Sequence, residues 1–234
     1  MPNAPPGNGS GAEAAPATPA RRGPKGAAVR DAQATKRRIL EASVVEFARY
    51  GLGGARVERI AKAARTNKRM LYYYVGNKEA LFLAALEAAY DDIRTAERAL
   101  RLEALAPLEA IERLVRFTWD YFVRKREFIM LLNSENLHKA RHLKQSKQIQ
   151  SMNSPLIATM GQILERGVAA GAVRPGIDPL QLYISIAALS FFYLSNASTL
   201  SVTFGRDLLA PEQMRERVDH IVGLVLSGVR PVPA

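Results

Sequence analysis

Residues 65–78 read RTNKRMLYYYVGNK, and this stretch decides how the first third of the chain folds. Asn67 is a typical helix cap, and Gly76 ends the eight residues that follow it. The pattern predicts a short helix over Lys68–Val75, with three consecutive tyrosines directly behind two positive charges. Successive helical residues point about 100° apart, so three adjacent rings cannot all face one core. Some of these tyrosines must therefore face outward.

The segments on either side also have helical patterns. Apolar residues at helical spacing predict a helix over Lys36–Tyr50 that ends at Gly51, and a short one over Val57–Ala64. After Gly76, Asn77 can cap a further helix from Lys78 to about residue 101. Two short helices joined by a tight turn predict a helix-turn-helix.

The positive charge is concentrated near the start of the chain. The net charge is +11; residues 1–30 hold four Lys/Arg and one Asp/Glu, and residues 31–80 hold eleven and five. The remainder is nearly neutral. This distribution favours a polyanion as the partner of the first third, where a uniformly basic surface would have no such focus.

Composition narrows the class of protein. With 234 residues and 48% apolar content, the chain can bury a substantial core. The absence of cysteine excludes disulfides and thiolate chemistry and fits a cytoplasmic location. Residues 1–30 are rich in Pro, Ala and Gly and lack the apolar run of a secretory signal, so they are predicted to form a disordered basic arm.

A helix-turn-helix explains the tyrosines. Its second helix lies in the major groove of double-stranded DNA, where Lys68 and Arg69 can reach bases or phosphates. Tyr72 and Tyr73 can line the groove face, because a tyrosine packs on a thymine methyl and donates its hydroxyl to a phosphate. Leu71 and Val75 are expected to return to the core. Two readings stay open for Tyr74, and less so for Tyr72: a DNA contact or packing of the three-helix unit.

Residues 35–82 resemble the amino-terminal DNA-binding domain of the TetR family of transcriptional repressors, through TKRRILEASVVEFARYG, VERIAKAA and NKRMLYYYVGNKEALF. The chain departs from the family at Arg56, where a Ser or Thr usually caps the second helix, and at Arg65, which replaces a turn glycine. If Arg65 still needs a positive φ, it is strained. The resemblance implies a recognition helix and a phosphate-binding lysine at position 78. Together with the pattern, it gives as DNA-binding candidates Arg56, Asn67, Lys68, Arg69, Met70, Tyr72, Tyr73, Tyr74 and Lys78.

Beyond residue 101 the chain reads as helices only. Pro107, Ser154-Pro155, Asp178-Pro179 and Pro211 are helix-start signals. The predicted fold class is therefore all-α: a helix-turn-helix DNA-binding domain over residues 31–80, and a helical effector-binding and dimerisation domain over residues 81–230.

Residues 179–205 carry no charge and have the length of a membrane span. Their many Ser, Thr, Asn and Gln residues disfavour a membrane, so a helix buried against the protomer and a partner subunit is the preferred reading. The last helix adds an apolar stripe over 214–229 and further surface at Leu224 and Leu226. The resemblance implies that these two helices form a four-helix homodimer interface, and twofold symmetry then requires a palindromic operator.

The resemblance also implies a small organic effector inside the carboxy-terminal domain. Aromatic walls with a few polar anchors are typical of such a pocket, although ordinary core packing is the alternative for each aromatic residue. The candidates are Trp119, Phe122, Met130, Asn133, Asn136, Tyr183, Phe192 and Asn196. His138 and His142 stand four apart and could hold a metal, but no third ligand is evident and a solvated helix face is favoured.

Two other classes of protein compete with a regulator. An enzyme needs a nucleophile with a base, a carboxylate pair or a phosphate-binding glycine loop, and none is evident; no metal or cofactor is expected. A nucleoid protein that binds DNA without sequence preference is the alternative to a regulator. The preferred function is a repressor that a small molecule releases from its operator, in control of a catabolic pathway.

Overall fold

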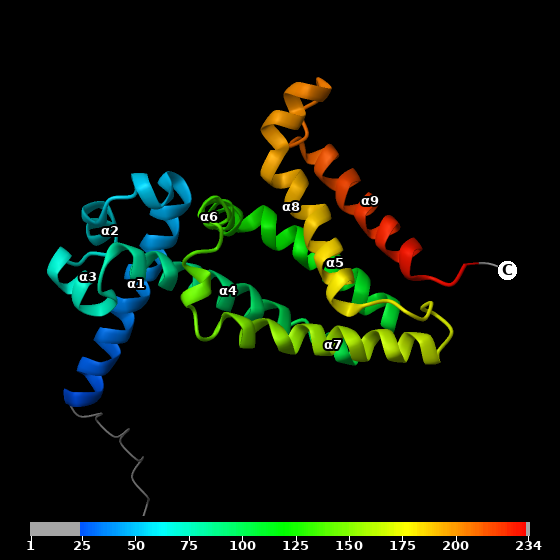
Figure 1. The fold of residues 1–234 in the computed structure, drawn as a ribbon, viewed down its shortest axis with the longest axis horizontal. Coiled ribbons are helices and arrows are strands. Elements are labelled where there is room, and N and C mark those ends of the chain that lie inside the picture. Colours follow the sequence, from blue (N-terminus) through cyan, green and yellow to red (C-terminus); the bar gives the residue numbers. More distant parts are fainter. Residues whose placement is uncertain (1–23, 233–234) are drawn as a thin grey trace, which may run out of the picture. The chain divides into compact units, whose positions relative to one another are not determined.

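The computed structural model describes residues 24–232, and within them all regular secondary structure is helical (Figure 1). The all-α prediction is confirmed. The α-helices are α1 (Pro24–Gly54), α2 (Val57–Ala63), α3 (Lys68–Val75), α4 (Lys78–Arg98), α5 (Pro107–Arg124), α6 (Arg126–Leu137), α7 (Ile149–Ala169), α8 (Pro179–Phe204) and α9 (Pro211–Val229). Two short 3-10 helices, η1 (Leu102–Ala104) and η2 (Leu143–Gln145), lie between them.

The first helix begins earlier than the sequence pattern predicts. It starts at Pro24, inside the segment predicted to be a disordered arm, so residues 24–30 are helical. Proline suits the first turn of a helix, and the alanines that follow have high helix propensity. The rest of the predicted arm lies outside the described residues. Of the described residues, 24–34 belong to one unit and 35–232 to a second, which contains the helix-turn-helix and every later helix.

Two glycines and two asparagines set the boundaries of the helix-turn-helix. Gly51 breaks α1 with φ of 63°, and Gly76 ends α3 with φ of 83°, a region that favours glycine. The Oδ1 atoms of Asn67 and Asn77 accept hydrogen bonds from the backbone N–H groups of Met70 and Ala80, each at 2.8 Å. These caps were predicted from sequence and are confirmed.

One buried apolar cluster runs from the helix-turn-helix into the carboxy-terminal domain. It contains Phe47 of α1, Ile60 of α2 and Leu71 of α3, and it continues through Phe82 of α4 to Phe128 of α6. The cluster therefore includes residues on both sides of residue 80, where the boundary between the two domains is predicted. A second cluster is formed by residues of α5, α7, α8 and α9.

The proline signals are confirmed at α5, α8 and α9, which begin at Pro107, Pro179 and Pro211. The prediction from Ser154-Pro155 is wrong, because α7 begins at Ile149 and Pro155 lies inside it. Because proline has no backbone N–H, α7 lacks one of its internal hydrogen bonds at this position. Side chains near it bond to backbone carbonyls, as Ser154 Oγ does to Gln150 O at 3.1 Å.

In α8 and α9, side by side in Figure 1, apolar residues face both inward and outward. The predicted α9 stripe packs inside the protomer, where Ile221, Val222 and Val225 are buried. On the outer side, Phe192 of α8 and Leu224 of α9 are exposed. By length and composition α8 is the one helix in the described residues able to cross a membrane, and 17% of its most apolar window is buried.

Candidate DNA interface and effector cavity

Helix α3 divides its three tyrosines between solvent and core. Tyr73 is 79% exposed and Tyr72 is 37% exposed, whereas Leu71, on the inner face of α3, is fully buried. Tyr74 is partly buried against the apolar cluster, and its ring meets that of Tyr73 edge-on at 5.4 Å. Tyr74 thus packs on the core while Tyr72 and Tyr73 are exposed, and the DNA contacts of all three stay predictions.

Positive charges surround the exposed tyrosines. Arg69 is exposed, and Lys68 Nζ donates to Glu58 Oε1 at 2.6 Å and lies 6.0 Å from the Tyr72 ring centre. The hydrogen bond to Glu58 raises the pKa of Lys68 and lowers the pKa of Glu58, so both groups are charged at neutral pH. A DNA phosphate would compete with Glu58 for this lysine.

The start of helix α2 is capped by a side chain from α1, a contact that was not predicted from the sequence. Arg56 offers no side-chain cap, as expected, but its backbone N–H donates at 2.8 Å to Oε1 of Glu46, which lies on α1. Arg59 Nε donates to the same oxygen at 2.7 Å. Burial raises the pKa of Glu46, but these two donors outweigh burial and leave the pKa lowered. The Arg56 side chain remains exposed and free to approach a phosphate.

The turn between α2 and α3 is held by a strained residue. Arg65 has φ of 52°, in the left-handed region that non-glycine residues rarely adopt, so the strain expected from the sequence is present. Its backbone N–H donates to the carbonyl of Lys62 at 3.2 Å, and that of Thr66 donates to Ala61 at 3.0 Å. These bonds fix the turn that orients α3.

Lys78 stands at the first position of α4 beside the last residues of α1, which follow the break at Gly51. Its Nζ donates to the carbonyl of Gly53 at 3.3 Å. The Asn67 side chain caps α3 by accepting a hydrogen bond from the backbone N–H of Met70. The Met70 side chain is partly buried. Of the predicted DNA-binding set, the structure thus leaves exposed the side chains of Arg56, Asn67, Lys68, Arg69, Tyr72 and Tyr73.

The predicted effector residues do not surround one cavity. Trp119 and Phe122 are buried in the core, where Trp119 packs on Tyr193 and Phe122 on Phe128. The remaining candidates divide into exposed side chains and side chains already bonded within the bundle. Met130, Asn136 and Phe192 are exposed, Asn133 donates to Ser195 at 2.9 Å, and Asn196 donates to the carbonyl of Phe192 at 2.9 Å.

Trp119 and Phe122 are therefore ordinary core residues, which was the alternative to a place in the effector pocket. Helical spacing identifies which side chains face inward, but it does not tell a filled core from a cavity wall. Among the candidates, Tyr183 accepts a hydrogen bond from Arg94, a residue that lines a cavity between α4 and α7.

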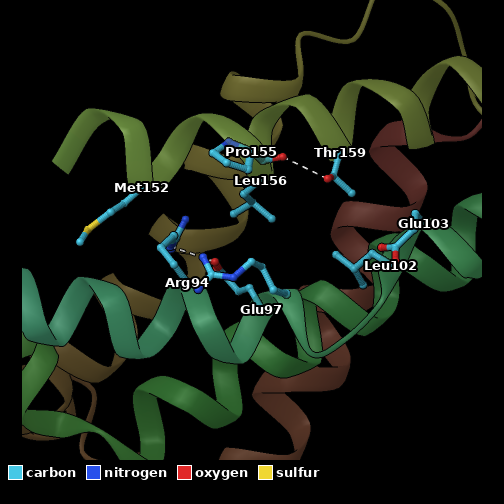
Figure 2. A pocket seen from close by; sticks show the side chains of 9 residues that line it. Arg94, Glu97, Leu102, Glu103, Met152, Pro155, Leu156 and Thr159 are labelled. Atoms are coloured by element: carbon cyan, nitrogen blue, oxygen red, sulfur yellow. Dashed lines mark hydrogen bonds and ion pairs between the residues drawn. The ribbon is translucent and has the colours of Figure 1, made fainter. Parts of the chain in front are cut away.

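A cavity of about 240 Å³ lies between α4 and α7, with η1 at one end (Figure 2). Figure 2 shows Arg94 and Glu97 rising from α4 toward Leu156 on α7. The lining residues are Arg94, Glu97, Arg98, Leu102, Glu103, Met152, Pro155, Leu156 and Thr159. A wider groove of about 620 Å³ between α1 and α4 is lined mainly by apolar residues and exposed acids such as Glu41 and Asp91.

Two buried charges dominate the smaller cavity. Arg94 is 3% exposed and Glu97 4% exposed, and Arg94 Nε lies 2.9 Å from Glu97 Oε2. Arg94 Nη2 donates to the hydroxyl of Tyr183 at 2.6 Å. Burial raises the pKa of Glu97 to about 7, although Arg94 acts to lower it. The Glu97 carboxyl group is therefore ready to change its charge near neutral pH.

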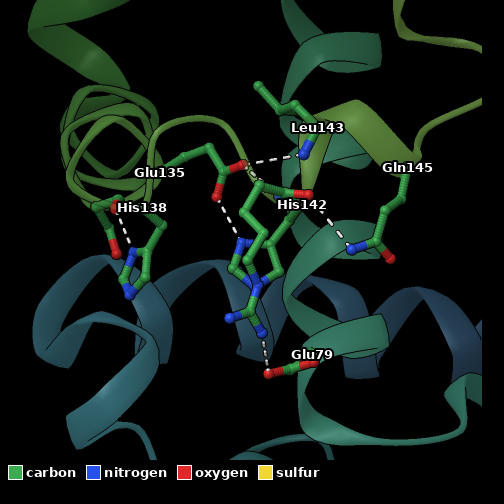
Figure 3. A network of polar contacts seen from close by, with 8 residues as sticks. Glu79, Glu135, His138, His142, Leu143 and Gln145 are labelled. Carbon is green, nitrogen blue, oxygen red and sulfur yellow. Dashed lines mark hydrogen bonds and ion pairs between the residues drawn. The ribbon is translucent and has the colours of Figure 1, made fainter.

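A polar network joins the end of α6 to α4 (Figure 3). His142 is buried, against the expectation of a solvated helix face, because the chain turns inward after α6 at Lys139 and Ala140. Its Nδ1 lies 2.7 Å from Glu135 Oε2, and its ring packs edge-on against Phe82 at 5.0 Å. Within residues 24–232, no three His, Asp or Glu side chains are placed to hold a metal.

The fold defines a helix-turn-helix protein that carries a larger helical domain. The model of bacterial regulatory proteins of the tetR family matches residues 39–85, and that of the tetracyclin repressor-like C-terminal domain matches residues 107–225. The chain therefore belongs to the TetR family, and it is a DNA-binding transcriptional repressor.

Known proteins similar to this chain agree with that assignment. The HTH-type transcriptional repressor NicS of Pseudomonas putida is 38% identical over 88% of this chain and 97% of its own length. The HTH-type transcriptional regulator RutR of Escherichia coli is 30% identical over 86% and 93%. A solved structure of the transcriptional regulator SCO4942 from Streptomyces coelicolor has a TM-score of 0.63 at 25% identity, with 84% and 99% covered.

Proposed function

We propose that the protein is a cytoplasmic homodimer that represses a catabolic pathway from a palindromic operator and is released when a small organic effector fills the cavity between α4 and α7. The observation that carries the DNA-binding part is the outer face of α3. There Lys68, Arg69, Tyr72 and Tyr73 are exposed together on a helix whose inner face is anchored by buried Leu71.

The outer faces of α8 and α9 support the homodimer. Exposed Ile184, Phe192 and Leu224 would leave an uncovered apolar surface on a single chain. A groove of about 710 Å³ between the two helices is lined partly by small residues, including Ser185, Ala188 and Gly228. Small side chains let a partner helix approach closely, so a second copy can cover this surface. Its twofold symmetry is the basis for a palindromic operator.

The length of α4 supports coupling of the effector to DNA. The helix begins with Lys78 at the helix-turn-helix and, sixteen residues later, presents Arg94 to the cavity. A ligand that contacts Arg94 therefore touches the same rigid element that positions the phosphate-binding lysine. A ligand shifts a conformational equilibrium only by its difference in affinity for the two states, and contacts from α4 can supply that difference.

The decisive experiment is selection of bound sites from random double-stranded DNA with the full chain. A twofold-symmetric consensus whose complex survives excess non-specific DNA would support a repressor. A protein that yields no consensus and is displaced by that competitor would instead be the nucleoid-associated alternative, and the proposal would fail.

Arg69→Ala and Tyr72→Ala are expected to change the selected site. The two side chains lie three residues apart on one exposed face near the start of α3, so both can reach base edges. Loss of one good base contact should cost roughly 1–3 kcal/mol of discrimination. Arg113→Ala, which removes an exposed arginine from α5, is the control and should leave the consensus unchanged. Weaker binding with an unaltered consensus in both variants would exclude direct readout by this face.

Lys78→Ala is expected to weaken binding to all DNA sequences about equally. A lysine that contacts phosphate releases a counterion but reads no base, so the slope of log affinity against log salt should fall by about one. Titration of operator and scrambled DNA between low and moderate salt measures both effects. Lys144→Ala removes the same charge from the exposed η2 segment and should change neither. A loss confined to the operator would make Lys78 a base reader.

A further inference from the structure

The cavity between α4 and α7 holds a charged group whose bonding capacity is only partly used. Arg94 is almost fully buried, yet its Nε and Nη1 atoms have no hydrogen-bond partner, and neither do the two carboxylate oxygens of Glu97. Nε and Glu97 Oε2 lie 2.9 Å apart as an ion pair without the geometry of a hydrogen bond, and Nη2 donates to the Tyr183 hydroxyl. Buried arginine side chains are normally saturated with acceptors, because an unpaired buried charge is strongly disfavoured. An acceptor is therefore missing at Arg94 Nη1.

The shape and sign of charge in the cavity define what could supply that acceptor. At about 240 Å³ the cavity is smaller than the range of about 300–1,000 Å³ typical of drug-sized sites, so the ligand is small. Leu102, Met152 and Leu156 give it apolar walls, and its charged lining residues besides Arg94 and Glu97 are Arg98 and Glu103. The unpartnered Nη1 of Arg94 is a donor and needs an acceptor, and a carboxylate matches the planar fork of a guanidinium.

We propose that the effector is a small organic acid whose single carboxylate binds Arg94 Nη1 beside Glu97, and that Glu97 is protonated in this complex. This inference rests on the proposed function, since it takes the cavity as the effector site. The proton is needed because two carboxylates that share one guanidinium repel each other when both are charged. Protonated Glu97 can donate its O–H to the incoming carboxylate, and both groups are then satisfied.

The groups around Glu97 fix the direction of the pH dependence. Burial raises the pKa of Glu97 to about 7, against the lowering effect of Arg94 and Arg98 on the same helix. The side chains that α7 contributes to the cavity do not titrate, and burial raises the pKa of Tyr183, so its hydroxyl stays neutral. The other titratable neighbours are Glu103 of η1 and Tyr121 of α5.

Below about pH 7 free Glu97 already carries its proton, so binding of the acid takes up none there. Above that value the proton must be taken from solvent. Affinity should then fall as pH rises, by up to about tenfold per pH unit.

The test is a titration of the full-length protein with three acids and their neutral amides, namely acetate, butyrate and benzoate against acetamide, butyramide and benzamide. Calorimetry and thermal shift at pH 6.5 measure binding. At least one acid should bind more tightly than its amide, and Arg94→Met should weaken that acid by about 10- to 100-fold, the effect of losing a charged hydrogen bond. The control is Arg113→Met, an exposed arginine of α5, which should bind the acid as the parent does.

Two further variants keep the test decisive if Arg94→Met does not fold. Arg94→Lys retains the charge but not the planar fork, and it should still lose most of the preference for acid over amide. Glu97→Gln has no carboxyl group to titrate, so acid affinity should become independent of pH between about 7 and 9, where the parent protein declines. The inference is overturned if no acid binds better than its amide, if the arginine variants bind acids normally, or if affinity in the parent does not change with pH.

Operator binding measured on the same preparations separates this inference from the proposed function. Intact operator binding without a preference for acids overturns the ligand assignment alone. Acid binding that depends on Arg94 in a protein that selects no operator leaves the ligand site standing and overturns the repressor.

Discussion

Leu224→Glu is expected to convert the protein from a dimer to a monomer and to reduce operator affinity by at least about 100-fold. Leu224 is exposed on the outer face of α9, so the glutamate does not disturb the protomer, but a dimer would bury its charge without a partner. An unpaired buried charge costs about 3–5 kcal/mol, and the twofold axis imposes the cost twice. Phe192→Glu on α8 should act in the same way. Analytical ultracentrifugation and operator titration measure the two effects.

The matched control for these variants is Leu137→Glu. Leu137 is 84% exposed at the end of α6, outside the two proposed interface helices, and it receives the same substitution. It should leave both assembly and operator affinity unchanged. Val222→Glu is unsuitable as an interface test, because Val222 is buried within the protomer and its replacement would unfold the chain. A Leu224→Glu protein that remains dimeric would place the interface elsewhere, and a monomer with full operator affinity would remove the need for a dimer.

Leu71→Ala is expected to lower the free energy of unfolding by roughly 2–5 kcal/mol, the usual cost of truncating a fully buried leucine. Leu71 is the single fully buried residue of α3 in the described structure, so its loss should release the recognition helix from the core. Operator binding should fall for every DNA sequence. Urea denaturation followed by circular dichroism measures the stability. Tyr73→Ala, two residues along on the exposed face, should unfold at the same urea concentration as the parent; equal stability of both variants would contradict the packing of α3.

Features that depend on a few neighbouring residues could be predicted from the sequence. The caps at Asn67, Asn77 and Asp178 each involve a side chain and a backbone N–H three residues ahead, so the local pattern contains the whole interaction. The break at Gly51 and the positive φ of Arg65 likewise follow from the turn itself. The all-α fold and the outward position of Tyr72 and Tyr73 are consequences of the same local rules.

Features that depend on distant residues could not be predicted. Glu46 caps α2 from ten residues away, and Tyr183 bonds to Arg94 from eighty-nine residues away. No periodicity connects such pairs. The α9 stripe shows a further limit, because its apolar pattern is the same whether the partner is α5 of the same chain or another subunit. The sequence did contain one indication of the cavity. Arg94 and Glu97 place two charged residues on the face of α4 that also carries apolar Ile93.

The continuity of α4 between Lys78 and Arg94 has a mechanical consequence. At 1.5 Å per residue, the sixteen residues between them make a lever of about 24 Å. Tilting this lever by about 5° around the cavity would displace its far end by about 2 Å, which exceeds the tolerance of a hydrogen bond to phosphate. In a dimer the displacement would occur at both ends of the operator. A change in position smaller than one bond length beside Arg94 is thus enlarged severalfold where the protein meets DNA.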